Sequence, residues 1–429
     1  MANRSGITVS YFGVNQAYQL ALAAQELGEL DAFYCSLYDA PGKWGGLLKM
    51  LLGDGKLVSR RCAGLDPKNA VEIPGPVLCE RLRARLPHGR QAKAWFETSC
   101  AFDREVSRRL GKSDSRLFVG VETCAELSLA RARELGMKTM LDCHGVGADF
   151  LDATARRAAE KLGLPTPVAS DSAWMSARKA QELALADQVT VCSELQRRLL
   201  EKQGLAPAKI SVVALWADPE LWFPAADRRP SSGPLKVIFA GKISLRKGVP
   251  YLLKAVASLG GSCELDLVGP MEGDLSIEDG RWKMGDGVRM LPPQTKQRLR
   301  ELYWQHDVLV LPSLGDSFGF VAMEAMACGL PVIVTENCGV PVPDPCWRVP
   351  VMDSEAIARR LEYYTSDREA LERDRLTAQG FSRQFTPERY RGQIKSLFRG
   401  LLENEGGERE EGRWKIGEEK SQIPNPKHQ

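Results

Sequence analysis

The sequence predicts an α/β protein made of two βα domains, each built on a parallel sheet. Three observations lead to this prediction. The chain has 429 residues, which is more than one hydrophobic core normally serves. Short apolar runs without polar alternation recur between helical stretches, as in parallel sheets that helices cover on both faces. The pattern is interrupted at Pro224–Lys236, where Pro, Ser and charged residues gather as they do in linkers.

The first half of the chain contains six runs that are typical of buried strands. They are Ile7–Phe12, Ala32–Leu37, Arg116–Val121, Lys138–Cys143, Gln188–Cys192 and Lys209–Ala214. Helical stretches separate them, and two of these, at 124–136 and 193–204, end in Gly after a periodic apolar face, as helix C-caps do. We therefore predict an N-terminal domain over residues 1–226.

The second half repeats the alternation. Strand-like runs occur at 236–241, 263–269, 287–291, 307–313 and 330–335, with helices from about Gly248, over Lys296–Gln305, and from about Phe318 to Cys328. We predict a C-terminal domain over residues 234–402. Residues 403–429 are charged, contain Gly and Pro and have few aliphatic side chains, so we expect a disordered tail.

The composition points to a cytoplasmic protein. Net charge is only +3, so nothing in the overall charge calls for nucleic acid as a partner. The 11 cysteines are odd in number and form no C-x-x-C pair, which argues against zinc or disulfide frameworks and fits a reducing cytosol. The first strand is predicted at Ile7, which leaves no room for a signal peptide, and no apolar run reaches the length of a membrane span.

The stretch "GDSFGFVAMEAMACGLPV", Gly315 to Val332, follows a predicted strand, and ligands collect beyond the carboxyl ends of parallel strands. Asp316 stands in an N-cap-like position of the next helix. Gly319 in its first turn leaves backbone amides uncovered, and these amides with the helix dipole can hold a phosphate. Glu324, further along, is suited to ribose hydroxyls. The alternative is that Asp316 only caps the helix and Glu324 only faces solvent.

A second loop carries two lysines, Lys242 and Lys247, in "FAGKISLRKGVPYLLKA". A nucleoside diphosphate leaving group needs positive charge, which the two lysines can supply; the alternative is that they are ordinary solvated loop charges. The chain contains no D-x-D pair, and its four histidines show no ligand spacing, so we expect no metal.

Three segments carry a resemblance to a known family. They are "FAGKISLRKGVPYLLKA", "LVLPSLGDSFGFVAMEAMACGLPVIVT" and "KISVVALWADPELWFP", and they resemble retaining glycosyltransferases of family 4. The resemblance covers 235–398 well and 7–224 more weakly. It implies the GT-B fold, in which two Rossmann-like domains face each other across a cleft. It also implies a metal-independent, retaining hexosyltransferase without a cofactor, of the kind used in polysaccharide biosynthesis. Such an enzyme moves a hexosyl group from a nucleotide diphosphate sugar, held by the C-terminal domain, to a glycan or lipid-linked acceptor, held by the N-terminal domain.

The resemblance also implies roles for residues of the C-terminal domain. Asp316 would contact the donor sugar, and the backbone amides of Phe318 and Gly319 would meet the sugar and the phosphate. Glu324 would bind the ribose. Lys247 and Lys242 would lie on the diphosphate. In this domain the predicted donor site therefore consists of Lys242, Lys247, Asp316, Phe318, Gly319 and Glu324.

In the N-terminal domain, the resemblance places His144 of "LDCHG" opposite the donor sugar and Gly13 of "YFGVNQAYQ" beside the donor. His144, Asp316 and Lys247 are the predicted catalytic residues. The sequence departs from the family pattern in three places: the first acid is Asp316 rather than Glu, Lys242 replaces a bidentate Arg, and Gly13 lacks the usual second Gly.

Two other readings of the function stay open, and the sequence names neither the nucleobase nor the acceptor. One is a catalytically weak, donor-binding partner subunit; the other is a sugar-nucleotide epimerase or hydrolase on the same fold.

Segment 43–61 mixes Trp and Leu with Lys and Arg, and segment 80–93 is rich in Arg. These segments suit an anionic acceptor or peripheral contact with anionic lipid at the inner face of the membrane; core-covering helices with solvated charges are the alternative.

Overall fold

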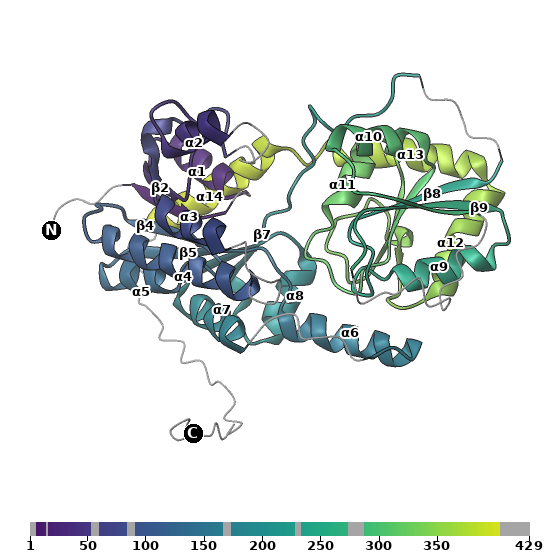
Figure 1. Ribbon diagram of the computed structural model, residues 1–429, viewed down its shortest axis with the longest axis horizontal. Coiled ribbons are helices and arrows are strands. Elements are labelled where there is room, and N and C mark those ends of the chain that lie inside the picture. Colours follow the sequence, from purple (N-terminus) through teal and green to yellow (C-terminus); the bar gives the residue numbers. More distant parts are fainter. Residues whose placement is uncertain are drawn as a thin grey trace.

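The computed structural model of the chain describes residues 6–13, 16–52, 60–83, 91–165, 173–227, 233–272 and 287–403 (Figure 1). Two parallel sheets lie apart from each other, and helices cover both faces of each. The prediction of two Rossmann-like α/β domains is confirmed. The predicted tail from 404 onward lies outside the described residues.

The first sheet has seven strands within the described residues, in the order β3-β2-β1-β4-β5-β6-β7. Its strands are β1 Ile7–Tyr11, β2 Leu30–Cys35, β3 Ala70–Glu72, β4 Leu117–Val121, β5 Lys138–Cys143, β6 Gln188–Val191 and β7 Ile210–Val212. All are parallel, and the central β4 is buried along its whole length, as its unbroken apolar run predicts. Its helices are α1 Ala17–Glu26, α2 Trp44–Leu52, α3 Pro74–Arg83, α4 Gln91–Leu110, α5 Glu126–Glu134, α6 Ala148–Leu162, α7 Ala173–Leu185 and α8 Glu194–Lys202.

The second sheet has six strands in the described part of the chain, in the order β10-β9-β8-β11-β12-β13. These are β8 Leu235–Ala240, β9 Cys263–Val268, β10 Val288–Leu291, β11 Val308–Leu311, β12 Val332–Thr335 and β13 Arg348–Val349. The helices are α9 Val249–Ser258, α10 Lys296–Gln305, α11 Phe320–Ala327, α12 Ser354–Ser366, α13 Arg368–Ser382 and α14 Pro387–Glu403.

Each sheet reverses its strand order once near its centre. The reversal lies between β1 and β4 in the first sheet and between β8 and β11 in the second. In open parallel sheets, a crevice forms at such a switch point, outside the carboxyl ends of the two strands. The fold therefore offers one site at the loops after β1 and β4 and another at the loops after β8 and β11.

The last helix returns to the first domain, where α14 packs against α1 (Figure 1). Arg391 and Lys395 of α14 both pair with Glu26 of α1, each at 2.7 Å. The ring of Tyr390 lies 4.9 Å from that of Trp216, which precedes the connection to the second domain. The bounds 1–226 and 234–402 stay a prediction, but the second range ends in a helix that packs on the first domain.

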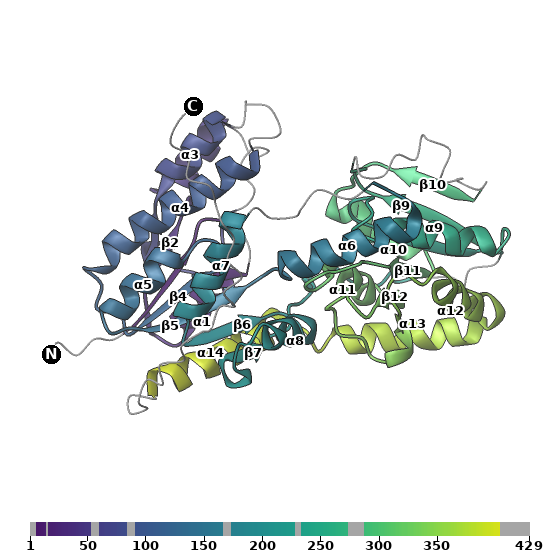
Figure 2. The same cartoon turned by 90° about the horizontal axis from the view of Figure 1, so that it is seen from below.

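The domains also touch through α6, which extends along the second domain in both ribbon views (Figure 2). Lys161 at its end donates to the carbonyl of Met352 at 2.9 Å. A Cβ on Gly315, after β11, would lie 2.7 Å from the side chain of Leu151, so the loop and the helix are in close contact. No helix among the described residues is both long and apolar enough to cross a membrane.

Candidate functional site

Two loops meet at the switch point of the second sheet. The loop after β8 carries Lys242 and Lys247, and the loop after β11 carries Asp316. The two loops approach each other closely at Gly248. Its φ is +72°, and a Cβ there would lie 1.9 Å from the carbonyl oxygen of Pro312. Only glycine tolerates this combination, because it has no side chain to clash and adopts positive φ at little cost.

Lys247 and Asp316 form the central ion pair of this site, with Nζ and Oδ2 2.5 Å apart. Their side chains are 18% and 15% exposed, so water screens the pair only in part. The other oxygen, Oδ1, accepts the amide of Gly319 at 2.9 Å and that of Phe318 at 3.4 Å. Asp316 therefore both caps the chain before α11 and holds the lysine, so the capping alternative describes only half of its contacts.

The start of α11 differs from the predicted one. The helix begins at Phe320 rather than at about Phe318, because Gly319 has φ +79° and cannot be part of a right-handed helix. Gly319 is the N-cap, in place of the expected Asp316. Its amide, predicted to meet a phosphate, is bonded to Asp316 here. Within the described residues, it is the amides of Phe320 and Val321 that find no acceptor.

Two predicted site residues contribute no side chain to this ion pair. Lys242 is exposed and pairs with Glu272 at 2.6 Å. The ring of Phe318 is buried, so only its backbone can face a ligand.

Glu324 lies on α11 with no hydrogen bond to its carboxylate in the part of the chain that the structure describes. Burial raises its pKa to about 7, although the charge of Lys296 on α10 works in the opposite direction. Glu324 is half-buried, so the reading in which it merely escapes to solvent describes only part of its surroundings. The described residues donate no hydrogen bond to this carboxylate, and a ligand with hydroxyl groups can do so.

The facing site in the first domain is built around His144, directly after β5. Its Nε2 lies 3.0 Å from Oδ2 of Asp142 and 3.2 Å from the side-chain nitrogen of Gln16. Burial lowers the pKa of His144, but the charge and hydrogen bond of Asp142 raise it more, so the net shift is upward. The backbone amides of His144 and Gly145 donate to one oxygen of Glu122, at 2.9 and 2.5 Å.

Gly13 lies in the loop after β1, on the other side of this switch point. A Cβ at Gly13 would come within 2.6 Å of the ring of Tyr11. That ring in turn lies 5.9 Å from the ring of His144, measured between centroids. Gly13 therefore lets the loop run close to the aromatic side chain beside the histidine.

The two half-sites meet at Cys192, after β6. Its Sγ lies 3.5 Å from the carbonyl oxygen of Ser317 in the second domain. Burial raises the pKa of this thiol, and the carboxylates of Asp142 and Asp316 raise it further. The carboxylate that holds His144 and the one that holds Lys247 thus both lie near the same buried sulfur, one in each domain.

Sequence reasoning missed several partners in these half-sites, namely Gln16, Glu122, Asp142, Cys192 and Glu272. Asp142 left a signal, since a carboxylate inside the apolar run "KTMLDC" needs a partner. Glu122 left none, because its contact with His144 depends on the neighbouring positions of β4 and β5.

The two segments proposed for anionic surfaces are described only in part. In the first, Trp44 is 54% and Leu47 43% exposed. Two of its cations are engaged internally: Lys43 donates to the carbonyl of Ala70 at 2.6 Å, and Arg60 to that of Phe12 at 3.1 Å. Arg61 is exposed, and the side chains of Lys49 and Lys56 lie outside the described residues. The side chains of segment 80–93 lie outside the described residues.

Comparison with solved structures defines the fold as GT-B, as predicted. The structure is similar to sucrose-phosphate synthase from Thermosynechococcus elongatus, with a TM-score of 0.65 and 20% identity over 93% of this chain and 100% of that chain. It is also similar to HepE from Anabaena in complex with UDP, with a TM-score of 0.61 and 15% identity over 92% of this chain and 100% of that chain.

Sequence comparison finds a family match within the second domain. Residues 234–367 match the family model described as glycosyl transferases group 1. A 159-residue segment is 34% identical to the D-inositol 3-phosphate glycosyltransferase of Mycobacterium tuberculosis. This segment is 34% of the chain and spans 33% of the length of that relative.

Proposed function

We propose that this protein is a retaining glycosyltransferase of family 4 that moves a hexosyl group from a nucleotide diphosphate sugar to a glycan or lipid-linked acceptor. The observation that carries the proposal is the arrangement around Cys192. On one side lies a lysine–carboxylate pair at the switch point of a domain that matches glycosyl transferases group 1. On the other lies a histidine–carboxylate pair of the opposite domain.

The donor would bind at the loops after β8 and β11. Its diphosphate would displace the carboxylate of Asp316 from Lys247, which frees Asp316 to accept a sugar hydroxyl. The unpaired amides at the start of α11 suit the same phosphates. Lys242, which pairs with the exposed Glu272, would leave this partner to contact them. Glu324 would accept the ribose hydroxyls. HepE, a structural neighbour, has been solved with UDP and with UDP-glucose, which supports a nucleotide sugar as donor class.

The chemistry would proceed on one face of the sugar. No side chain around Cys192 is placed as an evident nucleophile in the described residues, so retention would follow from attack by the acceptor on the face that the diphosphate leaves. As the bond to the anomeric carbon breaks, negative charge grows on the diphosphate, and Lys247 stabilises it. The departing phosphate takes the proton of the acceptor hydroxyl. His144 faces the sugar, held by Asp142, and closure of the domains excludes water.

The acceptor would lie on the first domain. A cavity of about 530 Å³ opens beside Glu122 and Gly145, between α6, α7 and α8. Its lining combines aliphatic side chains with Lys179, Gln196 and Gln203. An acceptor there would approach the donor past His144.

The decisive experiment is a thermal-shift screen of UDP-, GDP- and ADP-sugars, followed by transfer assays with the donor that stabilises, because a true donor raises Tm by mass action. NMR of the product then gives the anomeric configuration. Retention supports the proposal. An inverted product refutes the retaining mechanism, free sugar or an isomer favours the hydrolase or epimerase, and binding without turnover on glycan and lipid acceptors favours the partner subunit.

A further inference from the structure

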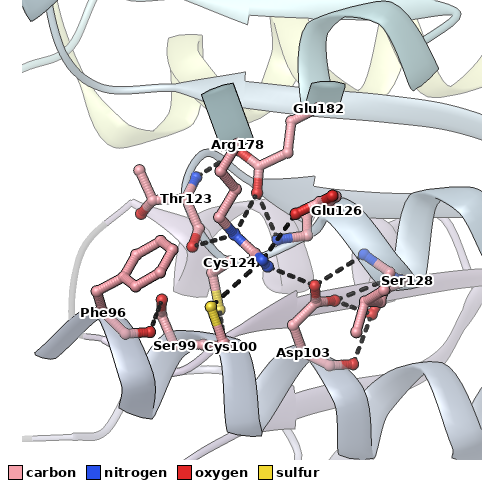
Figure 3. A network of polar contacts seen from close by, with 12 residues as sticks. Phe96, Ser99, Cys100, Asp103, Thr123, Cys124, Glu126, Ser128, Arg178 and Glu182 are labelled. Carbon is pink, nitrogen blue, oxygen red and sulfur yellow. Dashed lines mark hydrogen bonds and ion pairs between the residues drawn. The ribbon is translucent and has the colours of Figure 1, made fainter. Parts of the chain in front are cut away.

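A largely buried ion cluster lies beside the loop between β4 and α5 in the first domain. Arg178 of α7, whose side chain is 5% exposed, faces three carboxylates (Figure 3). These are Asp103 of α4 at 2.5 Å, Glu126 of α5 at 2.9 Å and Glu182 of α7 at 3.4 Å. Asp103 and Glu182 are fully buried. One guanidinium therefore balances more than one buried acid, an arrangement that adds little stability of its own.

The cluster holds the loop between β4 and α5 at several points. Glu182 accepts the amides of Thr123 and Ala125, at 2.5 and 2.8 Å. Arg178 donates through Nε to the carbonyl of Thr123 at 3.0 Å. Thr123 has φ +71°. A β-branched residue is an outlier at such an angle, and it keeps this conformation only when its surroundings impose it.

The loop presents Glu122, the residue directly before Thr123, to the next strand. One oxygen of Glu122 accepts both the His144 and the Gly145 amides. The path of contacts therefore runs from the buried cluster to Thr123, then to Glu122, and ends at the backbone of His144.

We propose that Glu122 is a positioning residue for His144. In the same way, Arg178 and Glu182 fix the loop from which Glu122 projects. This inference rests on the role proposed above for His144. If Thr123 relaxes to a negative φ, Glu122 turns away and the two amides lose their common acceptor. The histidine then shifts relative to the sugar, and a displacement of about 1 Å can lower a rate about 100-fold.

The test compares Glu122→Ala, Glu122→Gln and Glu182→Gln. Glu122→Ala removes the acceptor of the two amides, and we expect kcat to fall about 10- to 100-fold, with the donor KM changed less than about twofold because the donor lies on the other domain. Glu122→Gln keeps an acceptor oxygen and should restore most of kcat. Glu182→Gln places an amide nitrogen against a backbone N–H and should resemble Glu122→Ala.

A matched control is Arg133→Met, which breaks an ion pair of the same domain at the opposite end of β5. Arg133 lies 3.2 Å from Asp187, and Asp187 accepts the amide of Thr139. This variant should lower Tm and leave kcat unchanged. A purely structural role of the cluster predicts the same result for Glu182→Gln. If Glu182→Gln does not fold, Glu122→Ala, further from the buried cluster, still decides.

A second readout does not depend on turnover. The ring signals of His144 in NMR spectra can be assigned with His144→Asn, and they should shift in Glu122→Ala but not in Arg133→Met. Unchanged His144 signals and unchanged kcat in Glu122→Ala would overturn the inference. If wild type transfers no sugar while the His144 signals still shift, the positioning role stands and the proposed function fails.

Discussion

Replacing Lys247 by Met tests the proposed donor site most directly. The substitution keeps an unbranched side chain and removes the charge that lies 2.5 Å from Asp316. Asp316 keeps the amides of Gly319 and Phe318 as donors, so its charge is not left without partners. We expect the free energy of unfolding to fall by about 1–2 kcal/mol, which corresponds to a fall in Tm of about 2–8 °C.

The effect on turnover should be larger than the effect on stability or on binding. Removing one group that stabilises charge developing in a transition state costs about 100- to 1,000-fold in kcat. The affinity for the intact donor should fall less than about 10-fold, because the charge on the diphosphate is smaller before the bond breaks. Calorimetry gives the donor Kd, and single-turnover assays give the rate of transfer.

Lys236→Met is the matched control, since Lys236 is exposed at the opposite end of β8. It should leave both quantities as in wild type. Equal losses in donor affinity and in kcat for Lys247→Met would make the lysine a binding contact only, and no loss in either would refute the site.

Three further predictions concern neighbouring residues. Burial raises the pKa of Glu324 from 4.5 to about 7, so the folded protein keeps a proton that the unfolded chain has released, and stability falls as pH rises through that window. Glu324→Gln should therefore unfold at a higher temperature than wild type at about pH 8 but not at about pH 4. Parallel Tm curves would contradict the raised pKa of Glu324, and unchanged nucleotide affinity in calorimetry of Glu324→Ala would contradict the ribose role. Gly248→Ala places a Cβ against the carbonyl of Pro312 and should lower the free energy of unfolding, measured in urea, by at least about 2 kcal/mol. A change near zero would mean that the two loops are not in close contact. His144→Asn should lower kcat about 100-fold or more with donor Kd retained, and a weaker Kd at full kcat would assign the histidine to binding.

The elements with strong periodic patterns were predicted closely. The bounds of β5 and α10 agree with the predicted Lys138–Cys143 and Lys296–Gln305 to the residue. The three-residue strand β3 and the two-residue strand β13 were not predicted. The equally short β7 was predicted because it lies within the longer apolar run Lys209–Ala214. The start of α11 was placed too early because the left-handed turn at Gly319 depends on contacts with distant residues, among them Cys338.

The candidate site was predictable where the chemistry is local in sequence. Asp316, Glu324 and Lys247 follow strands whose positions the sequence indicates, and the structure brings Lys247 and Asp316 together. The contacts of Glu122 were not predictable, since they require the order of β4 and β5 in the sheet. The pairing of Lys242 with Glu272 requires the loop after β9, for which the sequence has no signal.

The return of α14 to the first domain bears on how the molecule can open. The chain passes from one domain to the other after Trp216 and comes back before Tyr390, and these two rings are in contact. Both crossings therefore share one pivot, anchored by the ion pairs of Glu26. We expect the two domains to open and close by a hinge rotation about that pivot rather than by a twist. The donor would then enter and the product leave through the same opening between the domains.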